Sequence, residues 1–223
     1  MIVHNCNFGL AYGAGASTLS RNLIVPQDEA QELLDGAMTL YARIPQWQQE
    51  TAQFMEKNGF TLTAFGTKRH ATEDIFSKDN GKVSRQHRQG TNATIQGTAA
   101  EMLRIVLTGI VERGLLDKLR MVFFAPIYDE TVAFVHKDDV VEYCRNMHEI
   151  MQGATPPQHA VQQQPEISIG KDWGAVHELG RWAENTPETI NAMVERCIEE
   201  GREMWATDMQ MSFEELFSAE EAA

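Results

Sequence analysis

The sequence has few cysteines, no long apolar run and few basic residues for its size. Its three cysteines (Cys6, Cys144 and Cys197) are far apart in 223 residues and form no CxxC pair. No histidine stands near them at the spacing of a metal site, so we expect separate reduced thiols and no zinc site. No apolar stretch approaches the about 18 residues that a membrane helix needs, and the N-terminus lacks the features of a secretion signal. The sequence therefore predicts a globular, cytoplasmic protein that does not bind a membrane.

Basic residues are outnumbered, and the net charge of −13 at first argues against a nucleic-acid partner, because phosphate contacts need lysine and arginine. The acidity is concentrated at the end of the chain, where residues 178–223 hold 12 acidic and 3 basic residues. Residues 57–88 instead contain seven lysines and arginines against three acids. A local basic band therefore remains available for a polyanion.

Hydrophobic periodicity predicts helices with a few short strands. Apolar residues at helical spacing indicate short helices around Pro26 and Pro45. The segment "FTLTAFGTKRH" alternates and turns at Gly66, which indicates a small hairpin. A helix is expected to begin at Thr186-Pro187, and "EISIGKDWG" before it predicts one short strand.

A long helix is predicted over roughly residues 84–113. Arg88, Asn92 and Gln96 are four residues apart and share one face of it. The opposite face carries an apolar stripe of Ile95, Ala99, Met102, Val106 and Ile110. Its uncharged polar residues are Gln86, Gln89, Asn92, Thr94, Gln96 and Thr98. Such groups hydrogen-bond to bases and sugars, although a solvated face or a protein interface has the same composition.

The segment "RMVFFAPIYDETVAFVHKDD" predicts a β-hairpin with acidic residues at its tip, in the connection Tyr128 to Thr131. Asp129-Glu130 is ordinary turn chemistry. A carboxylate raised on a rigid hairpin is also a place to hold Mg²⁺, which prefers oxygen ligands and shares itself with substrate phosphates. Both interpretations are compatible with these residues alone.

The opening stretch "NFGLAYGAG" places Phe8 and Tyr12 four residues apart, next to glycines that allow a tight turn. This stretch resembles the fingers-helix motif of the family A DNA polymerases, the bacterial DNA polymerase I group and its bacteriophage relatives. The segments "RQGTNATIQGTAAEMLR" and "IYDETVAFVHKDDV" resemble the template-primer helix and the catalytic hairpin of that family, in the same order. The resemblance extends from Cys6 to about Trp173.

The resemblance implies a function for each matching residue. Asp129 corresponds to the metal-binding aspartate of the catalytic hairpin, with Glu130 as the acid beside it, and the cofactor is Mg²⁺. Phe8 would lie against the sugar of the incoming nucleotide, and Tyr12 and Gly13 beside the templating position. The row Arg88, Asn92 and Gln96 would contact the minor groove of primer-template DNA. Tyr128, which stands where the family usually has histidine, would also bind the DNA, at the primer terminus, and Pro126 stands where a glutamine is common.

The family resemblance implies an α+β fold, with an antiparallel palm sheet, packed helices and a helical fingers segment. We expect fingers residues at 6–58, palm residues at 59–177 and an acidic C-terminal helical extension at 178–223. The first palm motif, with its aspartate, is not in this sequence. We therefore expect the C-terminal part of a DNA-directed DNA polymerase that uses a two-metal mechanism with deoxynucleoside triphosphates. The isolated chain would be inactive without an upstream polymerase segment.

Residues 1–5 do not resemble the fingers helix, because His4 stands where the family has a phosphate-binding lysine. "IVHN" followed by Cys6 resembles the C-terminal splice junction of an intein, in which Cys6 is the nucleophile, Asn5 cyclises and His4 assists. The alternatives are a freestanding subunit of a split polymerase and a non-catalytic remnant that binds primer-template DNA. In each case the source would be a bacterial or phage-infected cell.

The acidic tail includes "MQMSFEELF", for which there are two interpretations. It is a docking peptide for a sliding clamp or another processivity factor, or it is a solvated end of the chain.

Overall fold

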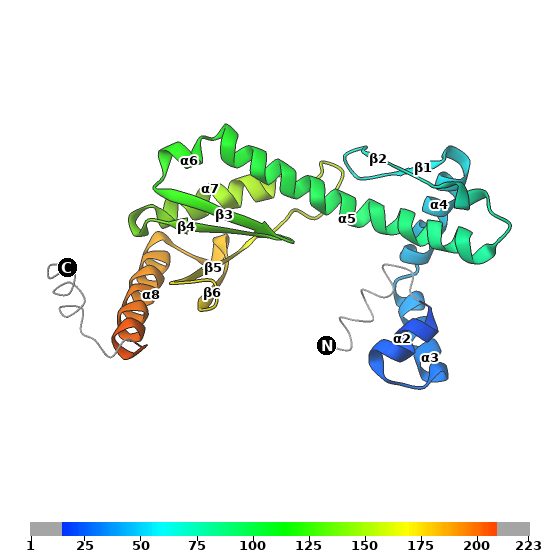
Figure 1. The fold of residues 1–223 in the computed structure, drawn as a ribbon, viewed down its shortest axis with the longest axis horizontal. Coiled ribbons are helices and arrows are strands. Elements are labelled where there is room, and N and C mark those ends of the chain that lie inside the picture. Colours follow the sequence, from blue (N-terminus) through cyan, green and yellow to red (C-terminus); the bar gives the residue numbers. More distant parts are fainter. Residues whose placement is uncertain (1–14, 209–223) are drawn as a thin grey trace, which may run out of the picture. The chain divides into compact units, whose positions relative to one another are not determined.

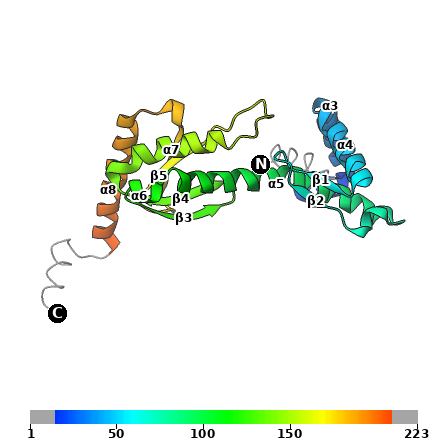
Figure 2. The same ribbon diagram turned by 90° about the horizontal axis from the view of Figure 1, so that it is seen from above.

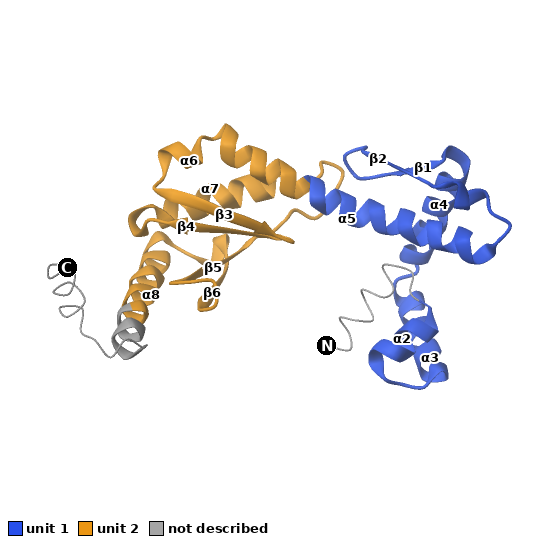
Figure 3. Ribbon diagram, in the orientation of Figure 1, with its two compact units in different colours: residues 1–101 blue, residues 102–223 orange. Residues whose placement is uncertain are grey.

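The computed structural model describes residues 15–208, with side chains up to residue 201. The chain divides into two compact units, residues 1–101 and residues 102–223 (Figure 3). Both units combine helices with short antiparallel strands, which confirms the predicted α+β class. None of the helices in the described part combines the length and apolar character that a bilayer crossing needs.

Among the described residues, the first unit contains three α-helices, a small hairpin and the first part of a long helix (Figure 1). Its elements are α2 (Ala16–Leu23), α3 (Gln27–Leu40), α4 (Arg43–Asn58), β1 (Phe60–Leu62), β2 (Lys68–His70), η1 (Glu73–Phe76) and α5 (Asn80–Glu112). The helices predicted around the two prolines are confirmed. Pro26 immediately precedes α3, and Pro45 lies in the first turn of α4, where backbone N–H groups have no helical partner.

The small hairpin predicted around Gly66 is also confirmed. Phe60 pairs with His70 and Leu62 with Lys68. Gly66 has a φ of 86°, in the left-handed region that favours glycine. The hairpin and α4 lie close to α5: a Cβ added to Gly90 would be 2.5 Å from Sδ of Met55. Close packing therefore explains why this helix tolerates an interior glycine.

The second unit contains the end of α5 and all later elements. These are α6 (Leu115–Lys118), β3 (Met121–Ile127), β4 (Glu130–Val135), η2 (Lys137–Asp139), α7 (Val140–Gly153), β5 (Glu166–Gly170), β6 (Val176–Arg181), η3 (Trp182–Glu184) and α8 (Pro187–Asp208). Helix α8 begins where the sequence predicts it. The Thr186 hydroxyl accepts a 3.3 Å hydrogen bond from the backbone N–H of Thr189, as expected of an N-cap.

Within the described residues, the strands form three separate two-stranded sheets. The predicted hairpin with acidic residues at its tip is present as β3 paired with β4. The strand predicted in "EISIGKDWG" is β5, and it pairs with β6 rather than with the β3–β4 hairpin. Strand β6 was not predicted, because its sequence "VHELGR" has charged residues and a glycine in place of a clear apolar alternation.

Helices α5 and α7 cover one face of the β3–β4 hairpin (Figures 1 and 2). The core between these elements is built on Val106, Ile110, Leu115, Met147, Ile150 and Ala154. Met121 and Phe123 of β3 pack against it. On the other face, the rings of Phe124 and Phe134 meet edge to face, with centroids 5.7 Å apart, and both are more than half exposed. The hairpin therefore has one covered face and one open apolar face.

Helix α8 and the β5–β6 hairpin share a second core in this unit. It contains Val140, Cys144, Ile190 and Val194, and the strand residues Ile167 and Ile169 pack against it. Ile190 is fully buried. Burial raises the pKa of Cys144 to about 12, so this thiol is protonated at neutral pH.

Candidate active site

The tip of the β3–β4 hairpin is a two-residue connection made of Tyr128 and Asp129. Ile127 pairs with Glu130 across the strands, so Glu130 is the first residue of β4 and not a turn residue as expected. Tyr128 has a φ of 55° and is 94% exposed. A bulky residue with positive φ is strained, and such strain often occurs at functional positions. The backbone conformation of this turn therefore fixes the position of Asp129 at the tip of the hairpin.

The carboxylates of Asp129 and Glu130 are adjacent and exposed to solvent. Within residues 15–201, neither carboxylate has a hydrogen bond or an ion pair. Each can accept a ligand through two oxygens, which is the chemistry that Mg²⁺ prefers. The residues at the tip therefore fit a hard cation that is shared with phosphate groups.

Helix α7 supports the hairpin from its covered side. The side chain of Thr131, two residues after Asp129, interacts with the hydroxyl of Tyr143 and lowers its pKa, against the larger effect of burial. Burial raises the pKa of Tyr143 to about 12, so its hydroxyl keeps its proton at neutral pH. This contact was not identified from the sequence, because Tyr143 looks like one more apolar position of an amphipathic helix.

An ion pair closes the other end of the hairpin. Nε of Arg120 donates to Oδ2 of Asp139 at 2.8 Å, and its backbone N–H donates to the same oxygen at 2.9 Å. These hydrogen bonds lower the pKa of Asp139 to about 2, so the carboxylate remains charged well below neutral pH. Arg120, the residue before β3, is thereby held against Asp139, the residue before α7. This contact limits movement of the strands.

The predicted polar row lies on α5 in the first unit. Arg88 and Gln96 are exposed, and Asn92 is half-buried. Nδ2 of Asn92 donates to Oε1 of Gln96 at 3.3 Å, and Arg88 donates to Ser84 at 2.8 Å. The three side chains therefore follow one another along the helix, with no acidic residue among them. The tip residues Tyr128, Asp129 and Glu130 belong to the second unit.

Two of the uncharged residues predicted to face a nucleic acid are buried. Gln86 is 5% exposed, and its Oε1 accepts a hydrogen bond from the backbone of Thr72. Thr98 is 6% exposed, and its hydroxyl accepts a 2.9 Å hydrogen bond from the backbone of Ala64. These residues hold the β1–β2 hairpin and the segment after it on α5. They therefore cannot contact DNA without breaking the unit.

The predicted apolar stripe of α5 is only partly correct. Val106 and Ile110 are buried, as expected, but Ala99 is exposed and Ile95 is half-buried. Between residues 86 and 101 of the helix, the buried side chains are instead polar and include Thr91 and Glu101. The helix therefore changes from a polar to an apolar packing face along its length.

Several predicted residues lie outside the described residues. They are the nucleotide- and template-binding Phe8, Tyr12 and Gly13, the splice-junction residues His4, Asn5 and Cys6, and the tail peptide. Their functions stay predictions.

Comparison with known proteins identifies the family of this chain. The family description "DNA polymerase family A" matches residues 2–175. The chain therefore belongs to DNA polymerase family A. It is 27% identical over 172 residues to the thermostable DNA polymerase I of Thermus aquaticus, which covers 77% of this chain and 20% of that protein. DNA polymerase I of Pseudomonas aeruginosa is 29% identical over 175 residues, covering 77% of this chain and 18% of that protein.

The fold is also similar to a solved polymerase domain. The POL domain of Pol1 from M. smegmatis, in complex with a DNA primer-template and dNTP, superimposes with a TM-score of 0.65 at 23% identity. The match covers 70% of this chain and 27% of that one. This chain spans about a fifth of the length of the curated relatives described above.

Proposed function

We propose that this chain is the C-terminal palm-and-fingers part of a DNA-directed DNA polymerase, which transfers nucleotides from deoxynucleoside triphosphates to a primer on a DNA template. The observation that carries the proposal is the position of Asp129. Asp129 lies within residues 2–175, which match the family description, and at the exposed tip of the β3–β4 hairpin. The covered face of this hairpin packs on α5 and α7. A catalytic carboxylate needs such rigid support, because small displacements weaken its action on the reacting groups.

In this proposal, Asp129 holds Mg²⁺, and Glu130 provides a second carboxylate next to it. The bound metal supplies charge neutralisation for the triphosphate and activation of the primer hydroxyl. Asp129 provides one of the two aspartates that the two-metal scheme requires. The second comes from a segment that carries the first palm motif of the family. We therefore propose that the 223-residue chain does not extend a primer by itself.

The open face of the β3–β4 hairpin is the proposed contact for that segment. Val122, Phe124 and Phe134 are 55–65% exposed on adjacent strands. An apolar group of this kind next to a catalytic tip fits burial against another part of the polymerase. Covering it would also remove water from around Asp129 and strengthen its interaction with a cation.

A reconstitution experiment tests the proposed function. The full chain is mixed with a polymerase segment that carries the first palm motif, and extension of a labelled primer is measured. We expect no extension by either part alone and extension by the mixture. Primer-template binding without extension in any mixture would favour a non-catalytic DNA-binding remnant. The Phe124→Asp variant tests the contact, because a buried charge should prevent assembly.

The polar row on α5 is the proposed contact for the minor groove of the primer-template. Arg88→Ala should weaken binding and reduce the slope of log affinity against log salt concentration by about 1, because one phosphate or sugar contact is lost. Fluorescence anisotropy of a labelled primer-template over a salt series measures both quantities. Arg145→Ala is the control, because Arg145 is already paired with Glu142 at 2.6 Å. An unchanged salt slope in Arg88→Ala would remove this residue from the interface.

The state of the N-terminus is a separate part of the proposal. If "IVHN" is the end of an intein, mass spectrometry of the native protein will find Cys6 joined by a peptide bond to an upstream polymerase segment. Recovery of an intact peptide that begins at Met1 would indicate a freestanding subunit. We place the activity in the cytoplasm of a bacterial or phage-infected cell, where a template is available.

A further inference from the structure

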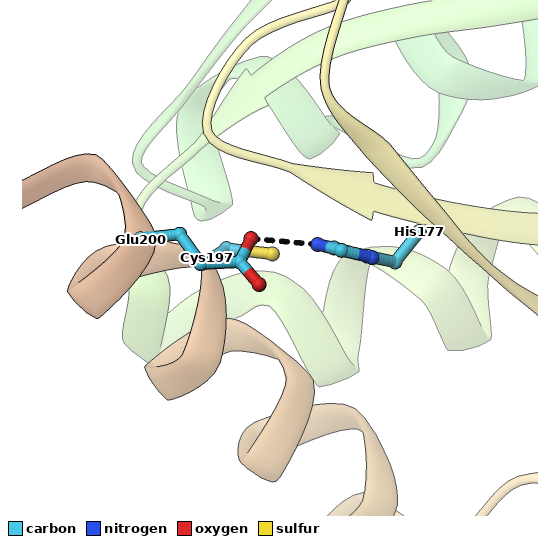
Figure 4. A group of neighbouring side chains, drawn as sticks. All are labelled: His177, Cys197 and Glu200. Atoms are coloured by element: carbon cyan, nitrogen blue, oxygen red, sulfur yellow. Dashed lines mark hydrogen bonds and ion pairs between the residues drawn. The ribbon is translucent and has the colours of Figure 1, made fainter. Parts of the chain in front are cut away.

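Three potential metal ligands come together beyond residue 175, where the family match ends. His177 lies on β6, and Cys197 and Glu200 lie on α8 (Figure 4). The ligand atoms of all three side chains lie within 4.8 Å of one another. Cys197 and Glu200 are three residues apart and therefore share one helix face, which His177 approaches from the hairpin.

The exposure of these side chains fits a site that an ion can enter. Cys197 is 4% exposed, whereas the side chains of His177 and Glu200 are 29% and 35% exposed. The thiol therefore lies at the inner end of the cluster, with the imidazole and the carboxylate at its mouth. Solvent can reach the cluster from one side and provide a further ligand.

Each of the proposed ligand atoms has a partner in the structure, so a bound ion would replace the contact between His177 and Glu200. Oε1 of Glu200 is held by Nε of Arg196 at 2.8 Å, and Oε2 lies 2.7 Å from Nε2 of His177. Sγ of Cys197 is 3.6 Å from the carbonyl oxygen of Ile169, at the limit of a sulfur hydrogen bond. Arg196 thus orients the carboxylate from outside, as groups that are hydrogen-bonded to the ligands do in metal sites.

We propose that His177, Cys197 and Glu200 bind one Zn²⁺ ion. Zinc binds nitrogen, thiolate sulfur and carboxylate oxygen at about 2.0–2.3 Å in a tetrahedron, so ligand atoms are roughly 3.2–3.7 Å apart. A shift of less than about 1 Å in flexible side chains produces this arrangement from the observed one. On binding, the Cys197 thiol releases its proton to water and its sulfur bonds to the metal. The proton between Nε2 of His177 and Oε2 of Glu200 also leaves, to water or to Nδ1 of the same ring, so that Nε2 can bind the ion. Water occupies the fourth position.

The site joins the β5–β6 hairpin to α8. The alternative is a simple ion pair between His177 and Glu200. Such a pair does not involve the Cys197 thiol, and a partly exposed ion pair stabilises a fold only slightly. A shared zinc ion links the two elements through three bonds and adds positive charge beside the acidic residues of this segment. Zinc would therefore stabilise the C-terminal extension in addition to the two cores.

Metal titration of the full 223-residue chain tests this proposal. After removal of metals, we expect one equivalent of Zn²⁺ to bind and to raise the melting temperature. Co²⁺, used as a coloured substitute, should give a tetrahedral spectrum with a sulfur-to-cobalt charge-transfer band. Cys197→Ser should remove this band and weaken Zn²⁺ binding by at least about 100-fold, and Arg196→Ala should weaken binding about 10-fold.

Matched variants make the result specific to these residues. Cys144→Ala should keep the cobalt band, because Cys144 does not belong to the cluster. His177→Asn and Glu200→Gln change partly exposed side chains and should weaken binding without unfolding the chain. Absence of stoichiometric zinc binding, or a cobalt band that persists in Cys197→Ser, would overturn the proposal.

Discussion

Asp129→Asn is expected to lower primer extension by on the order of 1,000-fold or more, since the charge of a metal ligand provides several kcal/mol of transition-state stabilisation. The substitution keeps the volume of the side chain and leaves Tyr128 and the hairpin pairing unchanged. Primer-template binding should therefore stay within about twofold of the original, because phosphate contacts dominate that affinity. Extension is measured by single-turnover kinetics in the polymerase reconstituted with the segment that carries the first palm motif.

Asp117→Asn is the matched control for this variant. Asp117 is also exposed, lies in α6 of the same unit and has no place in the proposed site. Its replacement should leave both extension and binding unchanged. If Asp129→Asn retains full extension, Asp129 is not the catalytic carboxylate and the proposed site is wrong. If it loses binding to the same extent as extension, the residue acts on DNA binding instead of the chemical step.

Ile190→Ala is expected to be the most destabilising of the substitutions considered for the second unit. Ile190 is fully buried between α8, α7 and the residues of the β5–β6 hairpin. Truncation of a buried isoleucine to alanine removes apolar contacts and leaves a cavity, which costs about 2–5 kcal/mol. Urea denaturation, followed by circular dichroism, should show this loss as a lower midpoint with a similar slope.

Two further variants calibrate this measurement. Ile190→Val removes one methylene group and should cost only about 0.5–1.5 kcal/mol. Ile105→Ala makes the same chemical change at a position that is 39% exposed, so its cost should be clearly smaller. Equal destabilisation by Ile105→Ala and Ile190→Ala would show that the α8 core does not hold this unit together.

Much of the local structure was predictable because it depends on contacts between neighbours in the sequence. Period-two apolar runs on either side of an acidic turn predicted the β3–β4 hairpin and placed Asp129 at its tip. The Thr186-Pro187 pair predicted the start of α8. The prediction was less accurate where polar side chains are buried. Gln86 and Thr98 were expected to be exposed, but they are buried and form hydrogen bonds with the segment around the β1–β2 hairpin.

The sequence by itself determined the family, through motifs in a fixed order, and the exposed position of the hairpin carboxylates. Only the tertiary structure decided which polar residues of α5 face inward, because that depends on a hairpin about 30 residues away in the chain. It also decided that β5 pairs with β6 and not with the β3–β4 hairpin. Linear spacing gave no reason to expect a zinc site at Cys197. Folding of β6 against α8 brings His177 beside Cys197 and Glu200, because core packing of apolar neighbours fixes the distance between the two elements.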